Sequence, residues 1–276
     1  MLLSDVFASY LLLHPLRQGS AYQLNRSYRL FGERLARVPT TEDLTAETVS
    51  AWVAWLQASD RYSPATVHGH RGRLLILWRF AHRKGWAGPV DEVRAAPRPD
   101  PMPEAWTLDE LRSILDAIER IDVVIGTVPM RLYLRALVQA AYETGLRRSD
   151  LWAIRQDAIR DDGTIMLRQS KTGRVHAPQL SIGTTALVRQ LPGAHPLAWP
   201  GRPRKFYQVW GRVLHLAGVP PGCLHRIRRT SATYVARDHG DDAARHFLGH
   251  RTPEMLRHYV DRRIAQPPQR LPPRIA

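Results

Sequence analysis

The sequence predicts a mainly helical α+β fold, in which a helical N-terminal domain precedes a second helical domain that contains one small antiparallel β-sheet. Three observations predict it. Apolar residues recur at helical spacing through residues 1–94, a proline-rich segment follows at residues 95–105, and short runs typical of strands lie within residues 157–181. We therefore expect domains at residues 1–94 and 106–276, joined by a linker at residues 95–105.

The N-terminal domain is expected to be a small bundle of helices with a basic face. Its apolar residues fall at helical spacing from Phe7 onward. Thr45 is the predicted N-cap of a helix with one apolar stripe. Ser63 and Pro64 are the predicted N-cap and first residue of the next helix, which is expected to stop at Gly85.

The second domain is expected to begin with a helix capped by Thr107, because Glu110 three residues later completes a capping box. A second helix is predicted over about residues 130–144. Gly145 follows it directly and suits the left-handed conformation in which many helices end.

A three-stranded antiparallel sheet is predicted over residues 157–181. The Asp-Gly pair at residues 162–163 and the Thr-Gly pair at residues 172–173 both suit tight hairpin turns. Lys171 lies at the second of these turns. Helices are expected to resume from about residue 183.

The charge of the chain predicts a polyanionic partner. The chain has forty Lys and Arg residues and twenty-five Asp and Glu residues, which gives a formal net charge of +15. Residues 1–98 hold 13 basic and 8 acidic residues and residues 99–276 hold 27 and 17, so both halves are basic and both are expected to touch nucleic acid. A GC-rich genome can replace Lys by Arg, but it does not by itself create the excess of base over acid.

Several other classes of protein are not expected. Cys223 is the only cysteine, so neither a disulfide framework nor a cysteine metal site is predicted. His246 and His250 are spaced as a pair of metal ligands, but no third ligand completes the pattern. The sequence has no phosphate-binding glycine-rich loop, no signal-peptide pattern and no run of transmembrane length. We therefore expect a cytoplasmic protein that uses no metal, ATP or other cofactor.

Four segments carry residues suited to phosphoryl chemistry: TGLRRSDL at 144–151, SKTG at 170–173, HRIRRT at 225–230 and LGHRTPEMLRHY at 248–259. In this order and spacing they resemble the tyrosine recombinase, or phage integrase, family. In that family an Arg follows a Thr-Gly-Leu turn, a Lys lies in a β-hairpin and a His-x-x-Arg opens a helix. A Tyr then lies nine residues beyond the His of a Leu-Gly-His segment.

The resemblance covers most of the chain and implies a two-domain, Xer-like protein. Its parts would be an N-terminal helical core-binding domain and a C-terminal integrase-type catalytic domain. The catalytic residues that the resemblance implies are Arg147, Lys171, His225, Arg228, His250 and Tyr259.

These residue types suit a covalent transfer of a phosphoryl group. A Tyr hydroxyl can form the phosphoryl-enzyme bond, but with an ordinary pKa of about 10 it needs help from its neighbours. Tyr259 is expected on a helix that Thr252 and Pro253 start. Arg147 and Arg228 can balance charge on phosphate oxygens through bidentate hydrogen bonds.

The other implied residues have distinct roles. His225 resembles the family's His that contacts the scissile phosphate and assists proton transfer, and His250 resembles a second His that donates a hydrogen bond to phosphate. Lys171 lies where the family has the general acid for the departing 5′ oxygen, and Lys, unlike Arg, can release its proton. Asp150 is expected to hold Arg147 in position, with a plain helix-N-terminal carboxylate as the alternative. For each residue the other interpretation is an ordinary surface or packing side chain.

The resemblance implies a site-specific DNA recombinase or integrase that cleaves and rejoins duplex DNA through a 3′-phosphotyrosyl intermediate. The implied assembly is a homo-tetramer on two DNA sites, with a dimer on each, and an accessory directionality protein is a further candidate partner. Two alternatives stay open: a type IB topoisomerase-like nicking and closing enzyme, and a non-catalytic DNA-binding relic. The residues expected to contact DNA are Arg148, Arg229, His68, Arg71 and Arg73.

Overall fold

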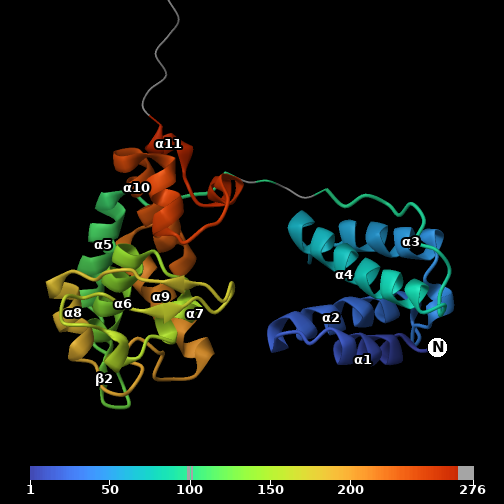
Figure 1. The fold of residues 1–276 in the computed structure, drawn as a ribbon, viewed down its shortest axis with the longest axis horizontal. Helices are drawn as coiled ribbons and strands as arrows, with labels where there is room; N and C mark the ends of the chain where they lie inside the picture. Colours follow the sequence, from blue (N-terminus) through green and yellow to red (C-terminus); the bar gives the residue numbers. More distant parts are fainter. Residues whose placement is uncertain (98–99, 101, 267–276) are drawn as a thin grey trace, which may run out of the picture. The chain divides into compact units, whose positions relative to one another are not determined.

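The computed structural model describes residues 1–97, 100 and 102–266, and the chain divides into two compact units, Met1–Pro101 and Met102–Ala276 (Figure 1). Residues 98, 99 and 101 of the expected linker lie outside the described residues. No helix in the described parts of the chain has the length and apolar character needed to cross a membrane.

The elements follow one another in the order α1 (Leu3–Leu13), α2 (Gln18–Leu35), η1 (Thr41–Asp43), α3 (Ala46–Gln57), α4 (Pro64–Arg83), α5 (Leu108–Glu119), β1 (Val124–Ile125), β2 (Val128–Pro129), α6 (Met130–Thr144), α7 (Arg148–Trp152), η2 (Gln156–Ala158), β3 (Leu167–Arg168), β4 (Val175–His176), α8 (Ile182–Arg189), α9 (Pro203–Ala217), α10 (Leu224–Phe247), η3 (Pro253–His258) and α11 (Arg262–Ala265). The mainly helical α+β class predicted from the sequence is confirmed.

The first unit is a bundle of the helices α1 to α4 around one apolar core. Both predicted N-caps are confirmed. Thr45 Oγ1 accepts a hydrogen bond from the backbone N–H of Thr48 (3.2 Å), and Ser63 Oγ accepts one from that of Thr66 (3.3 Å), with Pro64 as the first residue of α4. The largest buried side chains of this core include Phe31, Trp52 and Trp78.

Residues 93–96, which span the predicted boundary between the N-terminal domain and the linker, are bound to the first unit. Val93 and Ala96 are buried in its core. Arg71 donates from Nε to the carbonyl oxygen of Arg94 (2.8 Å), and Nδ1 of His68 lies 2.7 Å from the carbonyl oxygen of Ala96. These two side chains therefore hold the segment against α4.

Helix α6 lies at the centre of the second unit, where it packs against α5, α7, α8 and α10. The predicted capping box of α5 is confirmed by hydrogen bonds from Glu110 N to Thr107 Oγ1 (3.1 Å) and from Thr107 N to Glu110 Oε2 (2.7 Å). Gly145 ends α6 as predicted, with φ of 57°. A Cβ at Gly145 would overlap the ring of Phe247, so a larger residue here would require this side chain at the end of α10 to move.

The prediction of a three-stranded sheet over residues 157–181 is wrong. β3 and β4 pair antiparallel around the second predicted turn, but the remaining pairing is limited to isolated bridges of Ile159 with Ile165 and of Thr164 with Gln179. Pro178 has no N–H to donate, which interrupts the ladder between the second and third predicted strands, whereas the first predicted strand pairs only through the Ile159 bridge. A second small sheet, of β1 with β2, has no counterpart in the sequence prediction.

The segment around Tyr259 also differs from the prediction. Instead of an α-helix, the 3₁₀ helix η3 covers Pro253–His258, and Tyr259 directly follows it. The side chain of Thr252 makes no capping hydrogen bond.

Candidate active site

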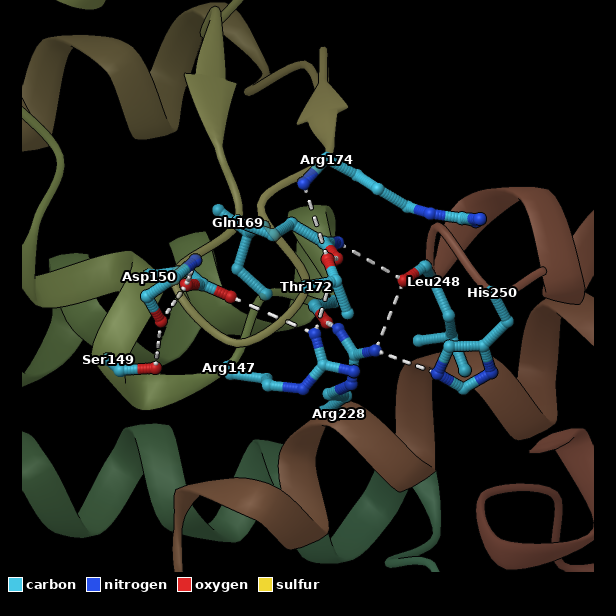
Figure 2. Close-up of polar contacts among 12 residues, drawn as sticks. Arg147, Ser149, Asp150, Gln169, Thr172, Arg174, Arg228, Leu248 and His250 are labelled. Atoms are coloured by element: carbon cyan, nitrogen blue, oxygen red, sulfur yellow. Dashed lines mark hydrogen bonds and ion pairs between the residues drawn. The ribbon is translucent and has the colours of Figure 1, made fainter. Parts of the chain in front are cut away.

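Arg228 lies at the centre of a cluster of polar residues in the second unit (Figure 2). It is 1% exposed and donates through Nη2 to the carbonyl oxygen of Leu248 (3.1 Å) and to Nε2 of His250 (3.1 Å). Its Nη1 donates to the carbonyl oxygen of Gly145. Within the described residues no carboxylate oxygen lies within 4.0 Å of this guanidinium. A buried cation without a carboxylate partner is stabilised when an anionic ligand joins it.

Arg147 approaches the same cluster from the residue that precedes α7 (Figure 2). Its Nη1 donates to Oε1 of Gln169 (3.3 Å) and lies 3.9 Å from Oδ2 of Asp150. The buried Asp150 also accepts, at Oδ1, hydrogen bonds from the backbone N–H and the hydroxyl of Ser170 (2.7 and 2.6 Å). Asp150 therefore lies where it can hold Arg147, and it also ties α7 to the turn that carries Lys171.

Tyr259 packs against two imidazole rings. Its ring centroid is 5.1 Å from that of His225 and 4.6 Å from that of His250, and each imidazole is tilted by about 60° to the phenol ring (61° and 62°). The central carbon of the Arg228 guanidinium is 5.0 Å from the same phenol centroid. The half-buried phenol packs against a small apolar cluster that includes Leu248, Leu256 and Val260. The structure thus brings together four of the six residues implied by the sequence, and Arg147 lies beside them.

Burial and positive charge keep both histidines neutral at neutral pH. Burial, together with the charges of Arg229 and Arg228, lowers the pKa of His225 to about 4. Burial, together with Arg228 and Arg147, lowers the pKa of His250 to about 3. The pKa of Arg228 is lowered to about 10 by burial and by the charge of Arg147, so this guanidinium still carries its proton. Neutral imidazoles beside fixed guanidiniums can accept or relay a proton.

Lys171 lies at the turn between β3 and β4 and is exposed. Its ammonium makes no hydrogen bond to any residue in the part of the chain that the structure describes. Its charge is among those that lower the pKa values of His225 and His250, so it acts on the same cluster. The ammonium is therefore free to bond a ligand there.

Residues 105–265 match the phage integrase family, which is more than half of the 276 residues. The chain belongs to the phage integrase family. Its relatives include the tyrosine recombinase XerD of Caulobacter vibrioides, 29% identical over 149 residues that are 53% of this chain and 47% of XerD. The integrase of Escherichia phage HK022 is 26% identical over 242 residues, 80% of this chain and 64% of that protein. The chain thus covers less than two thirds of the length of either relative.

Solved structures show the same fold. A lambda integrase dimer bound to a COC′ core site matches with a TM-score of 0.78 and 23% identity, over 99% of this chain and 81% of that one. The XerH recombinase bound to a palindromic difH substrate matches with a TM-score of 0.66 and 16% identity, over 90% and 77%. The resemblance inferred from the four sequence segments is therefore confirmed at the level of family and fold.

Two residues of this phage integrase family member that are expected to contact DNA lie near the cluster. Arg148 is exposed, donates to the hydroxyl of Tyr207, and has its guanidinium carbon 4.7 Å from the ring centroid of Trp152. Arg229 is half-buried on α10, with its Nε buried and unbonded among the described residues. Their contacts with DNA stay predictions.

The other three expected DNA contacts belong to the first unit. His68 and Arg71 are half-buried and bind the carbonyl groups of residues 94 and 96, while Arg73 is half-buried on α4. The hydrogen bonds of His68 and Arg71 give these side chains a structural role whether or not they also meet DNA.

Gln169 is a member of the cluster that the sequence analysis misses. It is 1% exposed and contacts Arg147, Thr172 and Leu248. Glutamine has no strong preference for such a site, and the only sequence signal is its position directly before the Ser-Lys-Thr-Gly segment.

The chemistry of the cluster suits an anion. Arg147, Arg228 and Lys171 supply positive charge, the two histidines are neutral, and Asp150 is the carboxylate in contact with Arg147. Among the residues that the structure describes, no three His, Cys, Asp or Glu side chains are grouped as metal ligands. A phosphate group is the ligand that such donors fit best.

Proposed function

We propose that this chain is a site-specific DNA recombinase or integrase that cleaves and rejoins duplex DNA through a 3′-phosphotyrosyl intermediate. The observation that carries the proposal is the position of Tyr259, which contacts the rings of His225 and His250 and the buried guanidinium of Arg228. Attack on a phosphodiester needs a nucleophile held beside fixed donors for the phosphate oxygens. This arrangement supplies both.

In the proposed cleavage step, the hydroxyl oxygen of Tyr259 attacks the phosphorus atom. A bond forms between the tyrosine oxygen and the 3′-phosphate, and the bond from phosphorus to the 5′ oxygen breaks. The phenol proton passes to the neutral imidazole of His225, and the departing 5′ oxygen takes a proton from Lys171. Attack by the 5′-hydroxyl of another strand reverses these steps and frees the tyrosine, so the bond energy is kept and no external energy source is used.

Charge on the phosphate is balanced by side chains that are already in place. Arg147 and Arg228 donate to the nonbridging oxygens, and His250 supplies a third donor. A preorganised donor of this kind typically lowers the barrier by about 3 kcal/mol. Because Gln169, Asp150 and backbone carbonyl groups hold the two guanidiniums, little reorganisation accompanies the reaction.

We also propose that duplex DNA is the partner, with a dimer on each site and a tetramer on two sites. Lambda integrase, which has the same fold, is known as a dimer on a core site and as a tetramer on a Holliday junction. The net charge of +15 supports a DNA partner, and binding should weaken steeply as salt rises. The proposed contacts are Arg148, Arg229, His68, Arg71 and Arg73.

The test uses a duplex selected from a random-sequence pool by its binding to the Tyr259→Phe protein. Copies of this duplex are prepared with a nick at successive positions. In one of them, cleavage should release a short strand that carries the 5′-hydroxyl. Because this hydroxyl is lost, the reaction cannot reverse and the adduct is trapped. Wild-type protein should give a detergent-resistant adduct, and Tyr259→Phe should bind equally and give none. Binding without an adduct for wild type would favour the non-catalytic relic. Relaxation of a supercoiled plasmid by a monomer would favour the topoisomerase alternative.

A further inference from the structure

We propose that Gln169 is a positioning residue that fixes Arg147 and the Lys171 turn relative to Arg228 and His250. The proposal rests on the proposed phosphoryl transfer at this site. Gln169 is assigned no contact with DNA, because both ends of its buried amide are already bonded to protein groups. It would act through the residues that it bonds.

Both ends of the Gln169 amide are engaged (Figure 2). Oε1 accepts hydrogen bonds from Nη1 of Arg147 (3.3 Å) and from the hydroxyl of Thr172 (2.9 Å). Nε2 donates to the carbonyl oxygen of Leu248 (3.4 Å), which also accepts from Nη2 of Arg228 (3.1 Å). One planar amide therefore connects the two guanidiniums of the site, since Arg147 bonds one end and the other end shares an acceptor with Arg228.

The orientation of this amide follows from its neighbours. A guanidinium and a hydroxyl that already donate face one end, and a carbonyl oxygen faces the other. Turning the amide over would place NH₂ against the guanidinium of Arg147 and two carbonyl oxygens against each other. The amide of Gln169 thus has a single favourable orientation. A side chain with one orientation can fix the positions of the groups that it bonds.

The backbone of Gln169 closes the turn that carries Lys171. Its N–H donates to the carbonyl oxygen of Arg174 (2.7 Å), and its own carbonyl oxygen accepts from Gly173 (2.8 Å). The ammonium of Lys171 has no other attachment among the described residues, so the turn alone determines where it can reach. Thr172, next to Lys171, is bonded to the side chain of Gln169, so the side chain and the turn are fixed together.

Gly249 packs directly against the same amide. It has φ of 64°, and a Cβ there would lie 2.8 Å from Nε2 of Gln169. The residue before His250 therefore has to leave room for Gln169, which places the amide where three of the four sequence segments meet: 144–151, 170–173 and 248–259.

The experiment compares Gln169→Leu with wild type in single-turnover cleavage of the selected nicked duplex. Leucine has a similar volume and makes none of the three hydrogen bonds. Two substrates are used, one with the normal 5′ oxygen at the cleaved phosphate and one with a bridging sulfur, which leaves without a general acid. Lys171→Ala lacks the proposed general acid, so its cleavage of the sulfur substrate shows how much activity the sulfur restores when the acid is absent. Gln179→Leu is the matched control, because Gln179 is exposed and its side chain, among the described residues, donates only to the carbonyl oxygen of Asp162 (2.9 Å).

With the oxygen substrate, Gln169→Leu should cleave about 30-fold more slowly than wild type, since small misplacements of catalytic groups cost this much. With the sulfur substrate the loss should shrink to about fivefold, because the contribution of Lys171 is no longer needed while Arg147 stays misplaced. Gln179→Leu should stay within about twofold on both substrates. Should Gln169→Leu fail to fold, Gln169→Glu carries the same comparison, since it keeps the acceptors for Arg147 and Thr172 but cannot donate to Leu248.

Cleavage by Gln169→Leu within about twofold of wild type, or an equal loss on both substrates, would overturn the positioning role. An equal loss would mean that the Lys171 turn is still in place, and that the substitution acts only through Arg147 or through the folded fraction. An absence of any adduct with wild-type protein would instead overturn the proposed function on which the inference rests.

Discussion

The guanidinium of Arg228 donates from Nη2 to Nε2 of His250 across 3.1 Å. A guanidinium has no acceptor, so Nε2 of His250 carries no proton and Nδ1 carries the single proton of the neutral ring. Nδ1 is buried and has no hydrogen-bond partner among the described residues. Arg228 thereby leaves His250 with one free donor, which suits a hydrogen bond to a phosphate oxygen.

This relationship predicts the protonation state of His250 in the free protein. Burial and the charges of Arg228 and Arg147 lower its pKa to about 3, so the ring should stay neutral down to about pH 4. In nitrogen NMR of ¹⁵N-histidine-labelled protein, with His250→Gln used for assignment, Nε2 should show the shift of an unprotonated ring nitrogen at pH 6. A ring with both nitrogens protonated at that pH would contradict the assignment.

The lowered pKa of His225 predicts that the free energy of unfolding depends on pH. Burial, Arg229 and Arg228 lower its pKa from 6.5 to about 4, so between these values the unfolded chain binds a proton that the folded chain does not. The contribution to stability is full above pH 6.5 and is lost as the pH falls toward 4. In urea unfolding, the free energy of unfolding of wild type should fall relative to His225→Gln by about 1–2 kcal/mol between pH 7 and pH 4.5, allowing for solvent screening. Parallel pH profiles for the two proteins would speak against this account.

The close approach of Gly249 to Gln169 predicts that a larger residue at position 249 destabilises the protein. Alanine there meets both a positive φ of 64° and the amide of Gln169 at 2.8 Å, so Gly249→Ala should lower the free energy of unfolding by about 2–3 kcal/mol. Gly126→Ala is the matched control, because Gly126 has φ of 61° and nothing within 4 Å of the added Cβ. It should cost only about 1 kcal/mol in the same urea titration. Equal losses would show that backbone conformation alone matters at Gly249.

The hydrogen bonds of Asp261 predict that this residue stabilises the segment that carries Tyr259. It is 1% exposed, and its Oδ2 accepts from the backbone N–H of Ala105 (3.1 Å) and from Arg263 (2.6 Å). Asp261→Ala would leave the buried N–H of Ala105 without a partner, so the free energy of unfolding should fall by about 2 kcal/mol. Asp242→Ala, at an exposed acid, should change it by less than about 0.5 kcal/mol.

The loss of stability caused by Asp261→Ala should also depend on pH. Burial alone would raise the pKa of Asp261, but the hydrogen bonds from Arg263 and Ala105 outweigh it and hold the pKa below its ordinary value of 3.8. The penalty of Asp261→Ala should therefore be constant at neutral pH and shrink as the pH falls below 3.8. A penalty that grows on acidification would contradict this sign.

Local rules account for what the sequence predicted well. The capping box of Thr107 and the helix end at Gly145 each depend on a few neighbouring residues, so the pattern is sufficient. The candidate site residues follow from a resemblance in order and spacing to the phage integrase family, to which the chain belongs. The sheet prediction was wrong in its extent: Pro178 removes a donor from the ladder of the second and third predicted strands, and the first is reduced to the Ile159 bridge.

Contacts between distant segments could not be predicted in the same way. Gln169 bonds a carbonyl group 79 positions away, and Asp261 bonds an N–H 156 positions away. Neither residue type favours such a role by itself. The same holds for the tautomer of His250, which depends on where the fold places Arg228.

The most direct measurement maps the DNA-linked residue in the trapped adduct. Nuclease treatment and trypsin should release the peptide of residues 258–262, because trypsin cuts after Arg257 and Arg262. Mass spectrometry should find a nucleotide attached through its 3′-phosphate to Tyr259, and no such peptide from Tyr259→Phe. A nucleotide on any other residue, or a wild-type protein that binds the selected duplex and forms no adduct, would contradict the central claim.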